Sequence, residues 1–149
     1  MSKKLINQLR ERIGPNILAI SIGIVYLWFG TLKFFPHMSP AEDLAKNTIH
    51  QLTFGQLSDG ITINLLAFWE VSIGILLVFN LWRKGALIIT MVHMILTFTP
   101  LLLFPMDSFQ NPPWIPTLLG QYIGKNLIIV AALVTLWRQA QKKEIYKSL

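Results

Sequence analysis

Four long runs of apolar residues dominate the pattern of hydrophobic and polar positions along the chain. They cover approximately Pro15–Phe35, Ile61–Leu81, Gly85–Phe104 and Thr117–Trp137. A helix needs about 20 mostly apolar residues to cross a hydrocarbon layer about 30 Å thick, and each run is close to that length. Four such helices in a chain of 149 residues would leave no polar face for water. The pattern therefore predicts one all-α domain over residues 1–149, an integral membrane bundle of four transmembrane helices.

Two shorter helices are predicted outside the four runs. In the segment Ser2–Ile13, apolar residues recur at helical spacing among lysines and arginines, which is typical of a helix on a membrane surface. Between the first two spans, Ser39-Pro40-Ala41-Glu42 has the N-cap serine, first-turn proline and third-position glutamate of a capping box. This second helix should run to about Phe54, stop at Gly55 and lie over the outer mouth of the bundle. The other outer connection, 104–116, carries four prolines and should be stiff and extended.

Composition and charge predict how this bundle is oriented in the membrane. The chain has no cysteine, 13% charged residues and a formal charge of +6 at pH 7. Without cysteine it has no disulfides, thiolate nucleophiles or iron–sulfur clusters. Lysines and arginines gather before the first span, between the second and third, and after the fourth, three segments that lie on one side of a four-span chain. We therefore expect both termini in the cytoplasm and contact with anionic lipid rather than with nucleic acid.

Every predicted span carries an ionisable side chain at membrane depth, namely Lys33, Glu70, His93 and Lys125. Such a group costs about 2.5–3.5 kcal/mol near the centre of the bilayer, so it usually faces the bundle interior and a partner. At about 1.5 Å per residue, Glu70 and Lys125 lie at similar depths, and we expect them to face each other. Their pairing would serve function or only fix the helix register. Lys33 is shallower and is expected to extend its amine toward the outer headgroups.

Polar residues at helical spacing widen these positions into stripes, one on each span. On the second span, Gly74 lies one turn from Glu70 and would let a neighbouring helix approach closely. If the stripes converge, the outer half of the bundle holds a polar cavity for an anionic or quinone-like ligand, or a proton path. The candidate catalytic residues are Glu70, His93 and Lys125, and the candidate ligand-binding residues are Tyr26, Lys33, Glu70, His93, Gln121, Tyr122 and Lys125.

Other roles for these polar residues are less well supported by the sequence. His93 and Glu70 supply too few ligands for a metal centre, and the spans offer no second histidine for haem, so we expect neither group. Asn64, Asn80 and Asn126 are interpreted as ordinary interhelical or interfacial hydrogen-bonding residues.

Four short motifs mark the predicted spans and the connection after the first. They are Trp28-Phe29-Gly30-Thr31-Leu32-Lys33-Phe34-Phe35-Pro36, the Ser39-Pro40 helix start, Glu70-x-x-x-Gly74 and Gly124-Lys125-Asn126. Together they resemble the DoxX-like family of small four-span bacterial membrane proteins, over approximately residues 15–137. The family takes its name from the small subunit of a thiosulfate:quinone oxidoreductase. The resemblance therefore implies a multi-pass protein of the bacterial cytoplasmic (inner) membrane, a quinone ligand and a redox partner subunit.

Three functions are compatible with these features. The first is a subunit of a quinone-linked membrane oxidoreductase assembly, in which the four ionisable groups supply hydrogen bonds and proton transfer and a partner supplies electrons. The second is a small-solute, anion or proton transporter or channel, which would need a homo-oligomer because 149 residues hold one unit without an inverted repeat. The third is a non-catalytic membrane scaffold or assembly factor. The resemblance favours the first.

Overall fold

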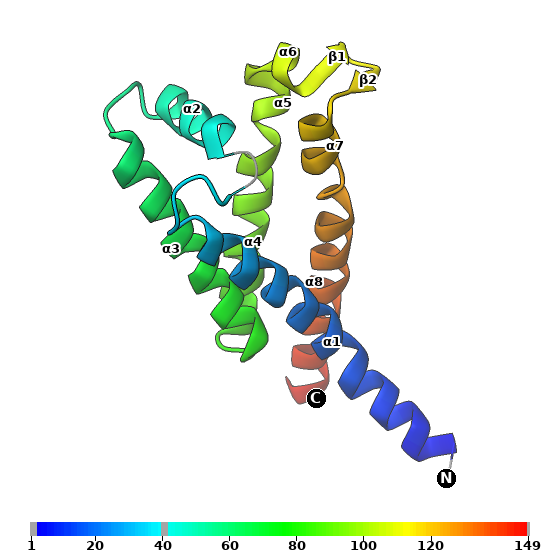
Figure 1. Cartoon of the computed structure of the whole chain (residues 1–149). Coiled ribbons are helices and arrows are strands. Elements are labelled where there is room, and N and C mark those ends of the chain that lie inside the picture. The colour runs from blue at the N-terminus through cyan, green and yellow to red at the C-terminus, as the bar shows by residue number, and fades with distance from the viewer. Residues whose placement is uncertain (1–2, 40–41, 149) are drawn as a thin grey trace.

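The computed structural model describes residues 3–39 and 42–148 of the chain, with side chains for 16–39 and 42–142, and it is mostly helical. In chain order the elements are α1 (Lys3–Leu32), α2 (Glu42–Leu52), α3 (Asp59–Val78), α4 (Arg83–Phe98), α5 (Pro100–Leu103), α6 (Pro105–Ser108), β1 (Phe109–Asn111), β2 (Ile115–Pro116), α7 (Leu118–Gly124) and α8 (Leu127–Ser148). Figure 1 shows α2 and the α6–β2 segment at one end of the bundle, here called the α2 end. Both chain termini and the α3–α4 turn lie at the other, here called the terminal end.

Within the described residues, three helical segments are long and apolar enough to cross a membrane. They are Asp59–Val78, Arg83–Leu103 and Leu118–Lys142. These segments correspond to the second, third and fourth predicted spans, which are confirmed to this extent. The apolar part of α1, Asn16–Leu32, is shorter than these segments. The first span therefore remains a prediction.

Large apolar side chains are exposed on several of these helices. Trp28 on α1, Phe68 on α3 and Ile128 on α8 are 67%, 69% and 74% exposed. Water-soluble proteins rarely expose large contiguous apolar areas. The surface is therefore compatible with contact with the hydrocarbon of a lipid bilayer.

α1 is longer than the first predicted span. It runs as one helix from Lys3 to Leu32, through the segment predicted to be a separate surface helix ending at Ile13. The sequence predicted that the first helix would end before Pro15. The described residues 3–14 show no such end of the helix. A proline fixes φ near the helical value and removes only its own N–H donor, so a helix can continue through it at a cost. The predicted interfacial helix is thus an extension of α1.

The third and fourth spans are interrupted, although the sequence predicted continuous helices. α4 and α5 meet at Thr99–Pro100, where the missing proline N–H breaks the helical hydrogen-bond ladder. Lys125 and Asn126 separate α7 from α8. There the Asn126 N–H donates to Ile123 O at 3.0 Å, one residue short of the α-helical partner. Each of these two spans therefore consists of a short helix at the α2 end and a longer one toward the terminal end.

α2 lies where the sequence predicted a helix after the first span. The helix is described from Glu42 onward. Two positions of the predicted capping box, 40 and 41, lie outside the described residues. The Glu42 carboxylate accepts a hydrogen bond from the N–H of His37, at 3.0 Å. The chain leaves the helix at Gly55, which has φ +74° and donates its N–H to His50 O at 2.8 Å. Glycine adopts this left-handed conformation at little cost, so the predicted stop is confirmed.

The proline-rich connection is partly folded. It contains α6 and a two-stranded antiparallel sheet of β1 and β2, where the sequence predicted only an extended segment. Thr117 ties this segment to the next helix, because its hydroxyl donates to Asp107 O at 2.8 Å and accepts from the Gly120 N–H at 3.1 Å. Thr117 is thereby the N-cap of α7.

α1 and α3 pack closely through glycines. A Cβ atom on Gly74 would lie 2.6 Å from Leu27 Cγ and 2.9 Å from Gly23 O, so only glycine fits without movement. The expectation that Gly74 lets a neighbouring helix approach is confirmed. Farther along α1, a Cβ on Gly30 would lie 2.9 Å from Glu70 Cβ. This contact places α1 directly against the carboxylate-bearing part of α3.

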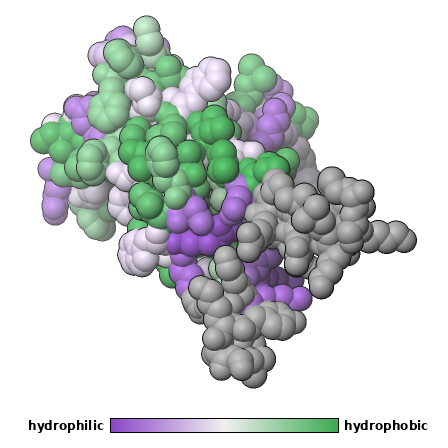
Figure 2. All heavy atoms as spheres, turned by 90° about the horizontal axis from the view of Figure 1, so that it is seen from below, coloured by the Kyte–Doolittle hydropathy of each residue, from purple (hydrophilic) through white to green (hydrophobic). Residues whose placement is uncertain are grey.

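The packed core lies toward the terminal end. Its buried residues are Ala19, Ile22, Tyr26, Ile73, Leu77, Ala86, Leu87, Met94, Leu133 and Leu136. At the same end, Arg83 donates to the side-chain oxygens of Asn80 at 2.7 Å and Asn16 at 3.1 Å. Figure 2 views the molecule from below and shows a hydrophilic patch beside a broad hydrophobic area.

Candidate functional site

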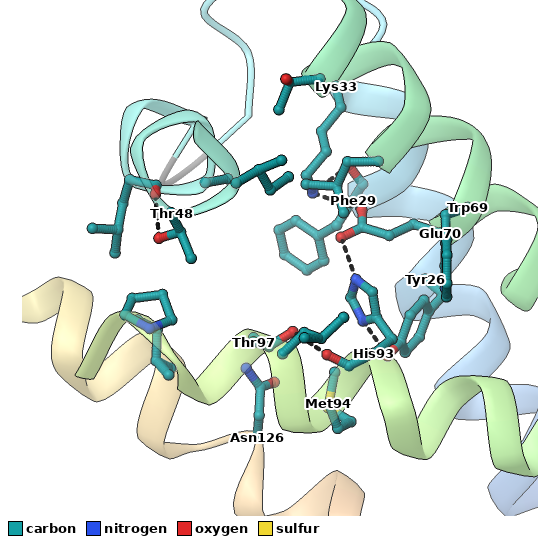
Figure 3. Close-up of a pocket in the computed structure, with 18 of the residues that line it drawn as sticks. Tyr26, Phe29, Lys33, Thr48, Trp69, Glu70, His93, Met94, Thr97 and Asn126 are labelled. Carbon is teal, nitrogen blue, oxygen red and sulfur yellow. Dashed lines mark hydrogen bonds and ion pairs between the residues drawn. The ribbon is translucent and has the colours of Figure 1, made fainter. Parts of the chain in front are cut away.

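A cavity of about 330 Å³ lies toward the α2 end, where the core residues give way to a hollow. Residues of α1, α2, α3, α4 and the α7–α8 region line it. Most of the lining is apolar or aromatic and includes Phe29, Leu44, Trp69, Met94 and Ile123. Figure 3 shows that the polar groups are confined to particular parts of the wall.

An ion pair in this wall joins α3 to Lys33, the residue that directly follows α1. Lys33 Nζ donates to Glu70 Oε2 at 2.6 Å, and each side chain is only 10% exposed. This corrects two predictions, because Glu70 pairs with Lys33 rather than with Lys125, and Lys33 turns inward rather than toward the headgroups. The close approach of α1 at Gly30 explains the pairing. A long lysine side chain can reach back along this contact to the carboxylate.

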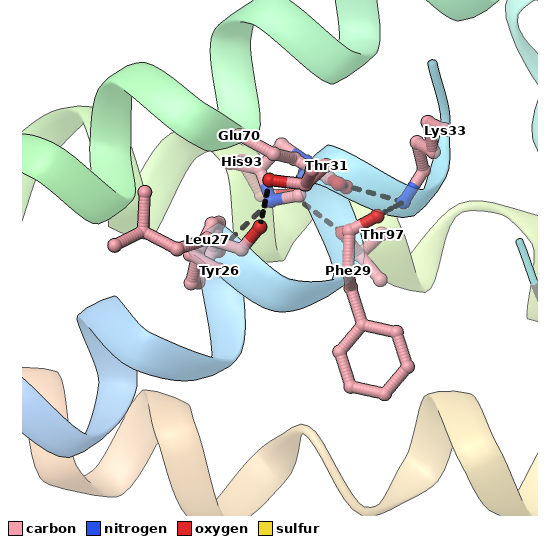
Figure 4. A network of polar contacts seen from close by, with 8 residues as sticks. All are labelled: Tyr26, Leu27, Phe29, Thr31, Lys33, Glu70, His93 and Thr97. Carbon is pink, nitrogen blue, oxygen red and sulfur yellow. Dashed lines mark hydrogen bonds and ion pairs between the residues drawn. The ribbon is translucent and has the colours of Figure 1, made fainter. Parts of the chain in front are cut away.

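His93 extends the ion pair to α4 and back to α1. Its Nε2 lies 3.4 Å from Glu70 Oε1, and its Nδ1 lies 2.9 Å from the Tyr26 hydroxyl. The Tyr26 and His93 rings also meet edge to face, with centroids 5.3 Å apart. Nε2 thus faces the carboxylate, and Nδ1 shares a hydrogen bond with the Tyr26 hydroxyl whose direction depends on the imidazole tautomer. We call Lys33, Glu70, His93 and Tyr26 the polar chain (Figure 4).

The polar chain can bind a polar group and exchange a proton with it. Donors and acceptors alternate along it, and each of its side chains is largely buried. Hydrogen bonds are stronger in such a low-dielectric setting, and His, Glu, Lys and Tyr are all able to act as general acids or bases.

Only part of the predicted polar stripe of the fourth span reaches the cavity. Tyr122 lines the cavity and meets Phe29 edge to face, with ring centroids 5.9 Å apart. Gln121 and Lys125 are exposed and do not line the cavity. Asn126, which lies one turn after Tyr122, lines the cavity in place of the expected Lys125.

Several lining residues carry no clear signal in the sequence. Phe29 and Trp69 are aromatic residues within apolar runs, and nothing in that pattern separates cavity walls from lipid-facing surface. Asn126 was interpreted only as an interhelical hydrogen-bonding residue. Its available signal was the helical spacing from Tyr122, which puts both residues on one face of a helix.

α2 covers part of the cavity through Leu44, Thr48 and neighbouring residues. Its first turn is held by Glu42, which accepts hydrogen bonds from Lys46 Nζ at 2.6 Å and from the His37 N–H at 3.0 Å. The hydrogen bond from Lys46 holds the pKa of the Glu42 carboxyl below its ordinary value. The same bond raises the pKa of the Lys46 ammonium. Both groups are therefore charged at neutral pH.

The residues and the comparisons limit what can be assigned to this site. Within the described part of the chain, no three histidine, aspartate or glutamate side chains gather as they would around a metal ion. The chain matches no protein-family model, no curated protein and no solved structure. Any function must therefore be argued from the cavity and the polar chain.

Proposed function

We propose that the protein is a four-span membrane protein of the DoxX-like group that binds a quinone-like molecule in this cavity. It would act as a subunit of a quinone-linked oxidoreductase assembly in the bacterial inner membrane. The observation that carries the proposal is the polar chain buried in one wall of an otherwise apolar and aromatic cavity.

The four-span arrangement is supported by the path of the chain. Both ends of the chain lie at the terminal end of the bundle, together with the α3–α4 turn (Figure 1). A path that starts and ends on one side needs an even number of crossings, so α1 would be the fourth. The basic segments of the sequence coincide with this end, and cytoplasmic segments of membrane proteins are rich in lysine and arginine. The α2 end and its cavity would then face outward.

The lining of the cavity supports a lipophilic ring as the ligand. Pockets for small molecules are typically apolar, with few polar groups that fix orientation, and about 300 to 1,000 Å³ in volume. Phe29, Trp69 and Tyr122 present aromatic surface to a flat ring. The polar chain offers hydrogen bonds to an oxygen on that ring. A quinone combines these two features.

In this function, the residues of the polar chain hold and move protons. The Lys33 ammonium can donate to a ring oxygen while Glu70 and His93 pass a proton between them. A bound quinone would supply the two-electron chemistry, and the partner subunit would exchange electrons with it.

Binding of decylbenzoquinone to the purified protein in lipid nanodiscs tests the proposal. Quinones quench tryptophan fluorescence on contact, and Trp69 lies in the cavity wall. We expect saturable quenching that is reduced in a Trp69→Phe variant. A Lys33→Gln/Glu70→Gln double variant, which removes both charges together, should bind about tenfold more weakly, the loss expected for charge-assisted hydrogen bonds.

Lys125→Gln is the matched control, since Lys125 is exposed and does not line the cavity. It should bind like the natural protein. The proposal is wrong if decylbenzoquinone does not bind, or if the double variant binds it as tightly as the Lys125→Gln variant does.

A further inference from the structure

The cavity has a second polar region, which does not belong to the polar chain. Asn126 and Thr97 line it, and they come from the two interrupted spans. Figure 3 shows Asn126 and Lys33 on opposite sides, with the Phe29 ring between them. Asn126 is thus separated from Lys33 by aromatic surface, and it adds to the other polar lining residues, Thr48 and Thr62.

The helix interruptions point to this region independently. Non-helical backbone at membrane depth is found where it is buried in protein or lines a cavity. In many transporters such interrupted helices mark the place where a ligand binds. Here both interruptions border one cavity, because Pro100 of the first and Asn126 of the second are part of its lining.

Asn126 has hydrogen-bonding capacity to offer a ligand. It is partly buried, and within the described side chains its amide makes no hydrogen bond. A free carboxamide can donate two hydrogen bonds and accept two. Thr97 donates its hydroxyl proton to His93 O at 2.9 Å and keeps its oxygen as an acceptor. Asn126 is therefore the group that could donate to a ligand oxygen here.

We propose that Asn126 is a second polar subsite, which binds the far oxygen of a ring whose near oxygen contacts the polar chain. This inference rests on the proposed function and narrows its ligand to flat rings with hydrogen-bonding oxygens at opposite ends, such as a para-quinone or its hydroquinone. Phe29 and Tyr122 meet edge to face beside the cavity and would flank the ring between the two oxygens. A ring with a single oxygen would leave Asn126 unused.

Two ligands and one substitution test the subsite. Decylbenzoquinone carries oxygens at both ends of its ring, and para-decylphenol carries one. Asn126→Leu keeps the size of the side chain and removes its amide. By isothermal titration calorimetry in nanodiscs, which detects both ligands, the variant should bind decylbenzoquinone about tenfold more weakly, the loss of one or two hydrogen bonds. It should bind para-decylphenol as tightly as the natural protein, which also shows that the variant is folded.

Asn64→Leu is the matched control, because Asn64 lies on α3, is exposed and does not line the cavity. It should bind both ligands normally. Unchanged binding of decylbenzoquinone to the Asn126→Leu variant would overturn the subsite and leave the proposed function standing. An equal loss for both ligands would also overturn it, because Asn126 would then support the cavity in general. If the natural protein binds neither ligand, the subsite and the proposed function fail together.

Discussion

Glu70 is the residue on which the polar chain depends. Its two carboxylate oxygens have different partners, with Lys33 on one and His93 on the other. A buried ion pair contributes little net stability compared with apolar residues, but breaking it leaves an unpaired charge at high cost. The Glu70 side chain on α3 therefore couples α4 to the residue that directly follows α1.

Removing only one charge of the pair should be more damaging than removing both. We expect Glu70→Gln to lower the free energy of unfolding by about 3 kcal/mol, because the Lys33 ammonium is left uncompensated. The Lys33→Gln/Glu70→Gln double variant should recover part of this loss. Denaturant unfolding of the purified proteins measures both values. Lys125→Gln, at an exposed position, should stay within about 0.5 kcal/mol of the natural protein. Additive losses in the double variant would contradict the pairing.

Tyr26 should contribute through one hydrogen bond and not through charge. Tyr26→Phe keeps the ring against His93 and removes the hydroxyl that lies 2.9 Å from Nδ1. We expect a loss of about 1 kcal/mol in the free energy of unfolding. Thr135→Val makes a suitable comparison, since it removes an exposed hydroxyl that bonds only within α8. Equal effects of the two substitutions would mean that the Tyr26 hydroxyl does not support the polar chain.

The sequence identified which residues of the site are ionisable, but not how they pair. Charges at membrane depth are costly and rare, so Lys33, Glu70 and His93 stood out from composition and depth alone. Their partners depend on the tilt of α1 and on the reach of a lysine side chain, which counting residues along straight spans does not include. Lys125 was expected opposite Glu70 for that reason, and it is exposed instead.

At the scale of elements, the contact between α1 and α3 sets the position of the polar chain. Glycines at 23, 30 and 74 remove the side chains that would separate the two helices. Such small-residue contacts let helix backbones approach closely in membrane proteins. Widening this contact would move Lys33 away from Glu70.

A methyl group in this contact should therefore be costly. Gly74→Ala places a Cβ 2.9 Å from the backbone oxygen of Gly23, which cannot rotate away. We expect a loss of about 1–3 kcal/mol in the free energy of unfolding, typical of overpacking. Gly124→Ala serves as the control, because a Cβ there meets nothing within 4 Å. Thermal unfolding should separate the two variants clearly, and equal midpoints would show that the helices do not need this approach.

The attachment of α2 should weaken in acid. The pKa of Glu42 is lower in the folded protein than in the unfolded chain, so its contribution is complete at neutral pH. The contribution is lost as the pH falls through the folded-state pKa, below the ordinary range of a carboxyl group. Amide hydrogen exchange in α2, corrected for the intrinsic pH dependence of exchange, should increase there relative to α3. Glu42→Gln should show the faster exchange already at neutral pH, and Asp43→Asn should not.

The sequence predicted the long helices well and their interruptions poorly. Apolar runs of span length are a strong signal, because few other structures need them. Pro100 indicated a break within the third span, because proline interrupts the hydrogen bonds of a helix. The break at Lys125 and Asn126 has no such signal, since both residues are compatible with a continuous helix. The lining residues keep helical spacing across the breaks, as Tyr122, Asn126 and Ile129 show, so periodicity indicates which side of a span lines the cavity but not which residues it faces.

At the scale of the whole molecule, the two ends of the bundle differ in charge and in packing. The terminal end has the core and the Arg83 contacts, whereas the α2 end has the cavity and its cover. In the proposed four-span arrangement, the positive-inside rule would place the basic end in the cytoplasm. This orientation is testable because the chain has no cysteine of its own.

Single cysteines introduced at the two ends should react from opposite sides of the membrane. Asp107 at the α2 end and Lys142 near the end of α8 are both exposed. In intact cells from which any outer membrane has been removed, a membrane-impermeant maleimide should label Asp107→Cys and leave Lys142→Cys unlabelled. Detergent should make both react. Labelling of Lys142→Cys from outside would show that the orientation is the opposite of the one proposed.

The separation of core and cavity also has a consequence for how this protein could change over generations. The residues that pack the core lie near the terminal end of the same helices whose other ends line the hollow. Substitutions of lining residues that belong neither to the core nor to the polar chain, such as Leu65 or Leu96, would therefore leave the tightly packed contacts in place and cost little stability. A lineage with this architecture can alter the shape and polarity of its ligand site in small steps, while each intermediate still folds. The same scaffold could thus come to accept different lipophilic molecules without passing through an unstable ancestor.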